Sequence, residues 1–264
     1  MSSITPTPPS VESRTSQPAR GKRRGWLVAL IAAAVLIGAG LFLWLMPVSN
    51  ASQTEVFEGD VNMLVIEVTG GVSLQGGERT ELTITKEWLF AGEPSVVTEH
   101  ENGVARVTGK CSWWQIRCTT SVSGTVASDA IIEVTASAGS IEVSGTTGGV
   151  DLETSAGSVR ADDVVGPARL ESSAGNISGT ITDGDVDAET SAGQIDLTVL
   201  GEFSSLSAST SAGNVDLTVT DDVYDVEADT AVGSVSVGVR TDPGAARQIF
   251  AESSAGSITI SPAP

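Results

Sequence analysis

The residues of this chain best suited to chemistry are its two cysteines, the tryptophans between them and its many carboxylates. Cys111 and Cys118 are the only cysteines. Outside a membrane, in an oxidising compartment, we expect them to form a disulfide, since two thiols alone cannot complete a structural zinc site. The loop between them carries Trp113 and Trp114. These rings are a candidate contact with a partner, a sugar or a membrane; the alternative is that one or both cover an open end or edge of a sheet.

Nothing in the sequence marks out a catalytic centre. Enzymes that cleave polysaccharides on a β-helix need clustered carboxylates in a cleft, often with basic residues beside them. Here His100 is the single histidine, Tyr224 is the only tyrosine, and Lys and Arg are sparse. No nucleophile elbow, phosphate loop, metal motif or calcium-binding repeat is present. We therefore predict a protein that is not an enzyme and needs no cofactor, with a polysaccharide-acting enzyme as the remote alternative.

The elements that position these residues are predicted by a repeat built on Ser-Ala-Gly. Apolar residues alternate with polar ones on both sides of each repeat, which is typical of two short strands around a turn. The residue before the glycine is small, and we expect it to point inward. A period of 18 to 23 residues without helical signal predicts an all-β fold, a β-solenoid of roughly ten coils over residues 57–262. The turn glycines are Gly139, Gly157, Gly175, Gly193, Gly213, Gly233 and Gly256.

The alternation also places charge on one face. Outward positions before the turn glycines are rich in Asp and Glu, as in Asp151, Glu153 and Glu189, whereas those after it are mostly Ser, Asn and Gln. Like charges about 4.8 Å apart on neighbouring strands repel, so an acidic face can collect cations or a basic partner. The simpler reading is that counterions screen it, and specific cation binding is not expected.

The amino-terminal residues predict a membrane anchor. The segment from Trp26 to Met46 is apolar and uncharged, and a basic cluster precedes it. As a helix this segment would be about as long as the bilayer core is thick. The positive-inside rule then puts a disordered tail (1–24) in the cytoplasm, a transmembrane helix at 25–46, a linker at 47–56 and the solenoid outside the cell membrane. A cleaved signal peptide near Ser49-Asn50-Ala51 and a twin-arginine signal at Arg23-Arg24 are the alternatives.

The charge of the exported part limits the classes of partner that it can bind. After residue 24 the chain has nine basic and 32 acidic residues, a formal charge of −23. Such a surface repels nucleic acid, which we exclude as a ligand. The partner expected is an unidentified envelope or surface protein or glycan. The spacings grow along the chain, and the extra residues fall in one turn series, as expected of a decorated edge.

The combined pattern resembles the DUF4097 family of bacterial proteins, which are described as candidate adhesins. The resemblance is carried by FEGDVNMLVIEVTGGVSLQGG, by the Cys-loop-Cys at 111–118, and by VSGTVASDAIIEVTASAGSIEVSGTTGGVDLETSAGSVRADDVVG; the copy at 230–233 (Thr-Ala-Val-Gly) departs from it. The resemblance implies a β-solenoid behind a single membrane helix in the bacterial envelope, and no catalytic residues carry over. Two functions follow: a membrane-anchored adhesion or scaffold module that binds a partner, or an envelope-stress sensor that signals through one.

Overall fold

Alternation of buried and exposed residues builds most coils of the molecule. In the strand β15 (Ile195–Leu200), Ile195, Leu197 and Val199 are buried while Asp196 faces solvent. The preceding strand β14 (Val186–Ala192) alternates in the same way. The two inward faces meet in a narrow apolar core, which is continuous from coil to coil. Here a coil means two strands joined by a turn that carries, in most coils, the repeated glycine.

The strands form two long sheets. The computed structural model describes residues 49–57, 60–89, 92–115 and 117–264. In spatial order the first sheet is β1 (Ser49–Val56), β4 (Glu81–Trp88), β7 (Thr119–Ala127), β3 (Val72–Gly77), β9 (Ile141–Ser144), β11 (Val159–Val165), β13 (Ile177–Thr182), β15, β17 (Val215–Val219), β22 (Ile258–Pro262) and β19 (Val235–Val237). The second sheet is β20 (Arg240–Thr241), β18 (Val223–Val232), β21 (Gln248–Ala255), β16 (Ser205–Ala212), β14, β12 (Ala168–Ala174), β10 (Val150–Thr154), β8 (Ile131–Ala136), β2 (Met63–Val68), β6 (Val104–Lys110) and β5 (Ser95–Glu101).

The all-β class is therefore confirmed, with two long and largely parallel sheets, as expected of a β-solenoid. The described residues contain nine coils rather than roughly ten, because β1, β4 and β5 pair antiparallel at one end. Within the expected linker at 47–56, residues 49–56 form strand β1. The expected tail (1–24) and membrane helix (25–46) lie outside the described residues. Within the part of the chain that is described, no helix has the length and apolarity needed to cross a membrane.

Neighbouring coils stack in register through the turn glycines. Equivalent residues pair directly, as Leu170 does with Ala188. Gly157 has a φ of 143°, and a Cβ there would overlap the carbonyl oxygen of Gly139 in the next coil. This close approach of neighbouring turns explains why glycine recurs at the same position of successive coils. The small residue before the glycine is exposed rather than inward, as Ala174 shows, so that expectation was wrong.

The inward position is filled instead by a buried hydroxyl three residues before the glycine. Thr190, for example, donates to the carbonyl oxygen of Gly175 in the neighbouring coil at 3.0 Å. We call the set of such bonds, which span 2.9–3.1 Å, the hydroxyl ladder. Its donors are Thr154, Ser172, Thr190, Thr210, Thr230 and Ser253. Each hydroxyl donates a hydrogen bond to a carbonyl oxygen that is shielded from water and would otherwise lack a donor.

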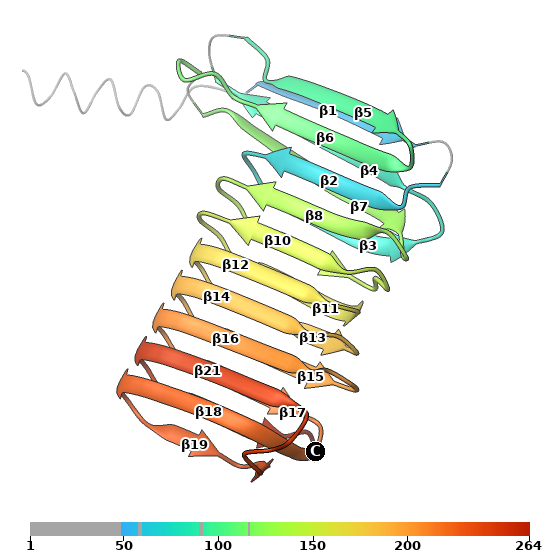
Figure 1. Ribbon diagram of the computed structural model, residues 1–264. Helices are drawn as coiled ribbons and strands as arrows, with labels where there is room; N and C mark the ends of the chain where they lie inside the picture. The colour runs from blue at the N-terminus through green and yellow to red at the C-terminus, as the bar shows by residue number, and fades with distance from the viewer. Residues whose placement is uncertain (1–48, 58–59, 90–91, 116) are drawn as a thin grey trace, which may run out of the picture. The chain divides into compact units, whose positions relative to one another are not determined.

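The order of the coils in space departs from their order in the sequence at both ends (Figure 1). The last coil, β21/β22, lies between β16/β17 and β18/β19. The first coil, β2/β3, lies between β6/β7 and β8/β9. Residues 238–247, which include the longest insertion, carry the chain back so that β21 can enter its slot. The extra residues in this turn, which the sequence predicted to decorate one edge of the stack, thus form a return connection.

Candidate binding surfaces

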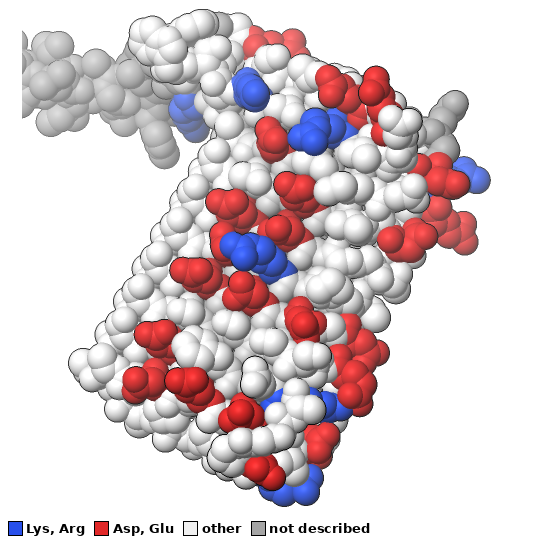
Figure 2. Space-filling view, viewed as in Figure 1, with Lys and Arg blue, Asp and Glu red and all other residues white. Residues whose placement is uncertain are grey.

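The acidic columns lie side by side on the outer surface of the second sheet (Figure 2). We call this surface the acidic face. Its two columns follow the strand register from coil to coil. One column is Val65, Glu133, Asp151, Arg169, Asp187, Ser207, Phe250 and Glu227; the other is Glu67, Thr135, Glu153, Glu171, Glu189, Ser209, Glu252 and Asp229.

Arg169 is a cation set into this acidic surface. Its guanidinium lies 3.3 Å from Asp187 and 4.0 Å from Asp151, and it also pairs with Glu171. The carboxylates therefore come from its own strand and from both neighbouring strands. Asp151 and Asp187 are more than half exposed, so the pairs contribute little to stability. What the arrangement shows is that the spacing of the columns suits a guanidinium.

The carboxyl group of Glu171 on this face has a displaced pKa. Partial burial raises the pKa of Glu171, and the neighbouring carboxylates of Glu153, Glu189 and Asp151 raise it further. Arg169 acts in the opposite direction and does not fully compensate. Burial first, and the neighbouring carboxylates after it, therefore disfavour the ionised form of Glu171.

A shallow groove of about 620 Å³ runs beside Arg169, where the strands of the second sheet begin. One side is apolar, with Pro167 and with Ile131, which is 51% exposed. The other side carries Asp151, Asp187 and Arg169. The groove thus offers apolar surface and negative charge within one site, which a Lys or Arg side chain can use through its stem and its head.

The Trp loop is the second candidate surface, and we use this name for residues 111–118. The predicted disulfide between Cys111 and Cys118 is confirmed. The loop takes the place of the glycine turn between β6 and β7. Trp113 is 92% exposed and Trp114 54% exposed, and their rings meet edge to face with centroids 5.6 Å apart. Both rings are thus open to solvent, and their role as a contact stays a prediction.

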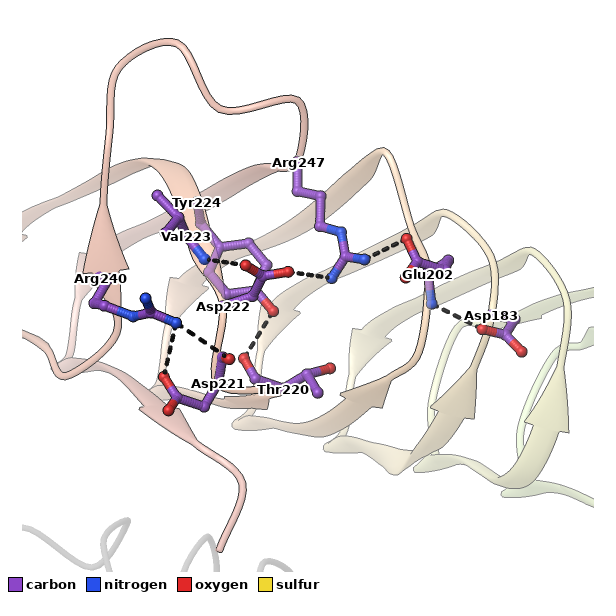
Figure 3. Close-up of polar contacts among 9 residues, drawn as sticks. All are labelled: Asp183, Glu202, Thr220, Asp221, Asp222, Val223, Tyr224, Arg240 and Arg247. Atoms are coloured by element: carbon purple, nitrogen blue, oxygen red, sulfur yellow. Dashed lines mark hydrogen bonds and ion pairs between the residues drawn. The ribbon is translucent and has the colours of Figure 1, made fainter.

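The third cluster lies at the turns of the C-terminal coils (Figure 3). The rings of Phe203 and Tyr224 stack with centroids 5.7 Å apart. The guanidinium of Arg247 lies 5.9 Å from the Phe203 centroid, 3.2 Å from Asp222, and pairs with Glu202. The hydrogen bond to Glu202 raises the pKa of Arg247, which stays charged. We call this cluster the Arg247 clasp; it joins the return connection to the coils on both sides of β21.

The remaining sequence candidates are separate from these clusters. His100 packs its ring edge-on against Phe57 at 5.8 Å between centroids. Among the described residues, no group of three or more His, Cys, Asp or Glu side chains is arranged to hold a metal ion. The sequence analysis missed the Arg247 clasp, because its members come from three different turns and only the spatial order of the coils unites them.

Comparison with known proteins gives similar solved structures only. No family model matches the chain, and no curated protein matches it. A candidate adhesin from Bacteroides fragilis is 14% identical and has a TM-score of 0.48; the alignment covers 80% of this chain and 98% of that one. A candidate cell adhesion protein from Clostridium sporogenes is 11% identical, with a TM-score of 0.37 and coverage of 81% and 100%. A candidate adhesin from Parabacteroides distasonis is 13% identical, with a TM-score of 0.37 and coverage of 80% and 97%.

Proposed function

We propose that the protein is a β-solenoid anchored in the cell membrane that acts outside the cytoplasm as a non-catalytic binding module. Its anchor is the segment 25–46, and its binding surface is the acidic face. The partner is an envelope or surface protein that presents a basic, extended segment to this face. The observation that carries the proposal is the groove beside Arg169, which combines exposed apolar surface with carboxylates.

The chemistry of the groove selects the partner. A Lys or Arg side chain can lay its aliphatic stem on Ile131 and Pro167 while its charged head reaches Asp151 or Asp187. The guanidinium of Arg169 already reaches Asp151 and Asp187 from within the chain. Glu153 and Glu189 in the other column form no ion pair with a described residue, and they are left for the partner.

The binding should be fast and sensitive to salt. The formal charge of −23 that the chain carries after residue 24 attracts a basic partner over a distance of about one Debye length, ~8 Å at physiological ionic strength. Electrostatic complementarity of this kind raises the association rate and selects partners more than it raises affinity.

A photo-crosslinking experiment tests the proposal with a matched control on one coil. Asp187 in β14 lies on the acidic face, and Asp196 in β15 lies on the outer surface of the first sheet; both are exposed. A photoreactive amino acid is placed at either position in the full chain, and intact membranes are irradiated. We expect a crosslinked envelope protein from position 187 and none from position 196. Equal labelling from both positions would contradict the acidic face as the binding surface, and recovery of a membrane regulator alone would contradict adhesion.

The anchor is tested separately by tags at the two ends of the chain. We expect a C-terminal tag to be stained on intact cells and an N-terminal tag only after permeabilisation. The mature protein should keep both tags. Loss of the N-terminal tag from the mature protein would show that the apolar segment is a cleaved signal and would overturn the anchor.

A further inference from the structure

The Trp loop lies at the corner where the described chain begins. Across β1, β4 and β7, Ser49 pairs with Trp88, and Glu87 pairs with Thr119. Since β1 and β7 are both antiparallel to β4, they start at the same edge of the first sheet. Ser49 and the end of the Trp loop are therefore about two strand spacings, ~10 Å, apart.

The expected membrane segment ends close to this corner. Met46 is three residues before Ser49, and three extended residues span at most ~11 Å. The headgroup layer itself is roughly 5–7 Å thick on each side of the bilayer core. A loop that projects from the corner of Ser49 is thus within reach of the bilayer surface.

The side chains of the Trp loop suit that surface. Trp113 and Trp114 are both exposed, and Trp is enriched at membrane–water interfaces because its ring is largely apolar and its N–H is polar. The loop is also held in place: the disulfide closes it, and the side-chain amide of Gln115 donates to the carbonyl oxygen of Gly92 at 2.8 Å. A preformed loop loses little conformational entropy when it binds.

The loop carries exposed positive charge: Lys110 directly precedes it and Arg117 lies within it, and both are exposed. Neither forms an ion pair with a described residue, and the same holds for Arg79 at another turn, whereas Lys86, Arg106, Arg160, Arg169, Arg240 and Arg247 are all paired. Two unpaired cations beside two exposed indoles, in an acidic protein, match the phosphates and the interfacial zone of a phospholipid surface.

We propose that the Trp loop is a second membrane contact, which inserts Trp113 and Trp114 among the phospholipid headgroups of the bilayer that holds the anchor. Lys110 and Arg117 bind lipid phosphates beside them. The inference rests on the anchor of the proposed function and adds to it a fixed orientation, because two attachment points limit the tilt of the stack relative to the bilayer.

Fluorine NMR of the full chain in phospholipid nanodiscs tests this contact. The five tryptophans are replaced biosynthetically by 5-fluorotryptophan and their lines are assigned with Trp→Phe variants. A lipid with a nitroxide on its headgroup then broadens fluorine lines near the membrane surface. We expect the lines of Trp113 and Trp114 to broaden as strongly as that of Trp44, and to be protected from a water-soluble paramagnetic reagent.

The tryptophans of the apolar segment separate the possible failures. If Trp44 broadens while Trp113 and Trp114 respond only to the water-soluble reagent, the anchor stands and the second contact is overturned. If neither Trp26 nor Trp44 responds to the lipid label, the anchor fails and the contact with it. Broadening of Trp113 and Trp114 only after envelope proteins are added would assign the loop to a protein partner and also overturn the inference.

A charge substitution with a matched control tests the basic flank. The double variant Lys110→Gln/Arg117→Gln should show weaker broadening of Trp113 in nanodiscs that contain phosphatidylglycerol. Arg79→Gln removes an exposed charge from the opposite edge, in the turn between β3 and β4, and should leave the broadening unchanged. Equal effects of the two changes would contradict a local role for Lys110 and Arg117.

Discussion

Single hydroxyl groups hold neighbouring coils together at the turn. Thr190 is buried and donates to the Gly175 carbonyl oxygen. In Thr190→Val the shape is nearly kept, but the carbonyl loses its donor. We expect the free energy of unfolding to fall by about 1–2 kcal/mol, as measured by chemical denaturation of the full chain in detergent.

The control for this change lies in the next strand of the same coil. Thr198 in β15 is half-buried on the outer surface and forms no side-chain hydrogen bond with a described residue. Thr198→Val should change the stability by less than about 0.5 kcal/mol. If both variants behave alike, the hydroxyl ladder does not contribute to the stack.

The acidic face predicts a pH effect at Glu171. Its pKa is raised in the folded protein, first by burial and then by the neighbouring carboxylates. A carboxyl group with a raised folded pKa favours folding when it is protonated, so its ionisation weakens the fold as the pH rises. Glu171→Gln should therefore raise the melting temperature at pH 7, and this gain should vanish as the pH falls below the pKa of the group. A loss of stability at pH 7 would contradict this reading of the face.

Sequence patterns identified the glycines of the turn but not the hydroxyls that serve them. The glycine column is visible because its identity is nearly fixed. The inward position holds Thr or Ser and reads as an ordinary polar residue. Its burial continues the alternation of the strand, as Val186, Ala188 and Thr190 show, whereas the bend at the turn exposes the alanine beside the glycine.

At the scale of strands and coils, the Arg247 clasp holds the inserted coil in place. The Arg247 side chain is 17% exposed and contacts Glu202, Asp222 and Phe203. In Arg247→Met the two carboxylates lose their cation. We expect faster hydrogen exchange in β18, β19, β21 and β22, with β10 to β15 unchanged, because each coil contacts only its neighbours.

Arg240 provides the comparison for this prediction. Its side chain is 65% exposed and its ion pair with Asp221 is 3.7 Å long. Arg240→Met should leave hydrogen exchange in β21 and β22 unchanged. Uniformly faster exchange along the whole stack in Arg247→Met would contradict a local role for the clasp.

The strands could be predicted from the sequence, whereas their order in space could not. Alternation around each glycine gave the coils at 131–219. The inward residues of successive coils are so alike that β21 fits equally well on β16 and on β18, as the direct pairing of Ala251 with Ala208 and Ala228 shows. Pattern alone therefore does not distinguish a sequential stack from one with an inserted coil.

For the molecule as a whole, the excess of carboxylates predicts a general response to salt. The self-repulsion of an acidic chain is relieved when ions screen it. We expect the midpoint of thermal unfolding to rise with NaCl, and to rise by the same amount with CaCl₂ at equal ionic strength. A clearly larger rise with CaCl₂ would reveal a specific divalent site on the acidic face.

The inserted position of the last coil has a consequence for how the protein is made. β18 and β19 reach their final neighbours only when residues 248–262 have filled the slot between them and β16/β17. These residues follow β18 and β19 in the sequence and are therefore synthesised after them. The coils at this end of the stack cannot be added one by one in the order of synthesis, because β18 and β19 must wait until a later segment has been made and exported.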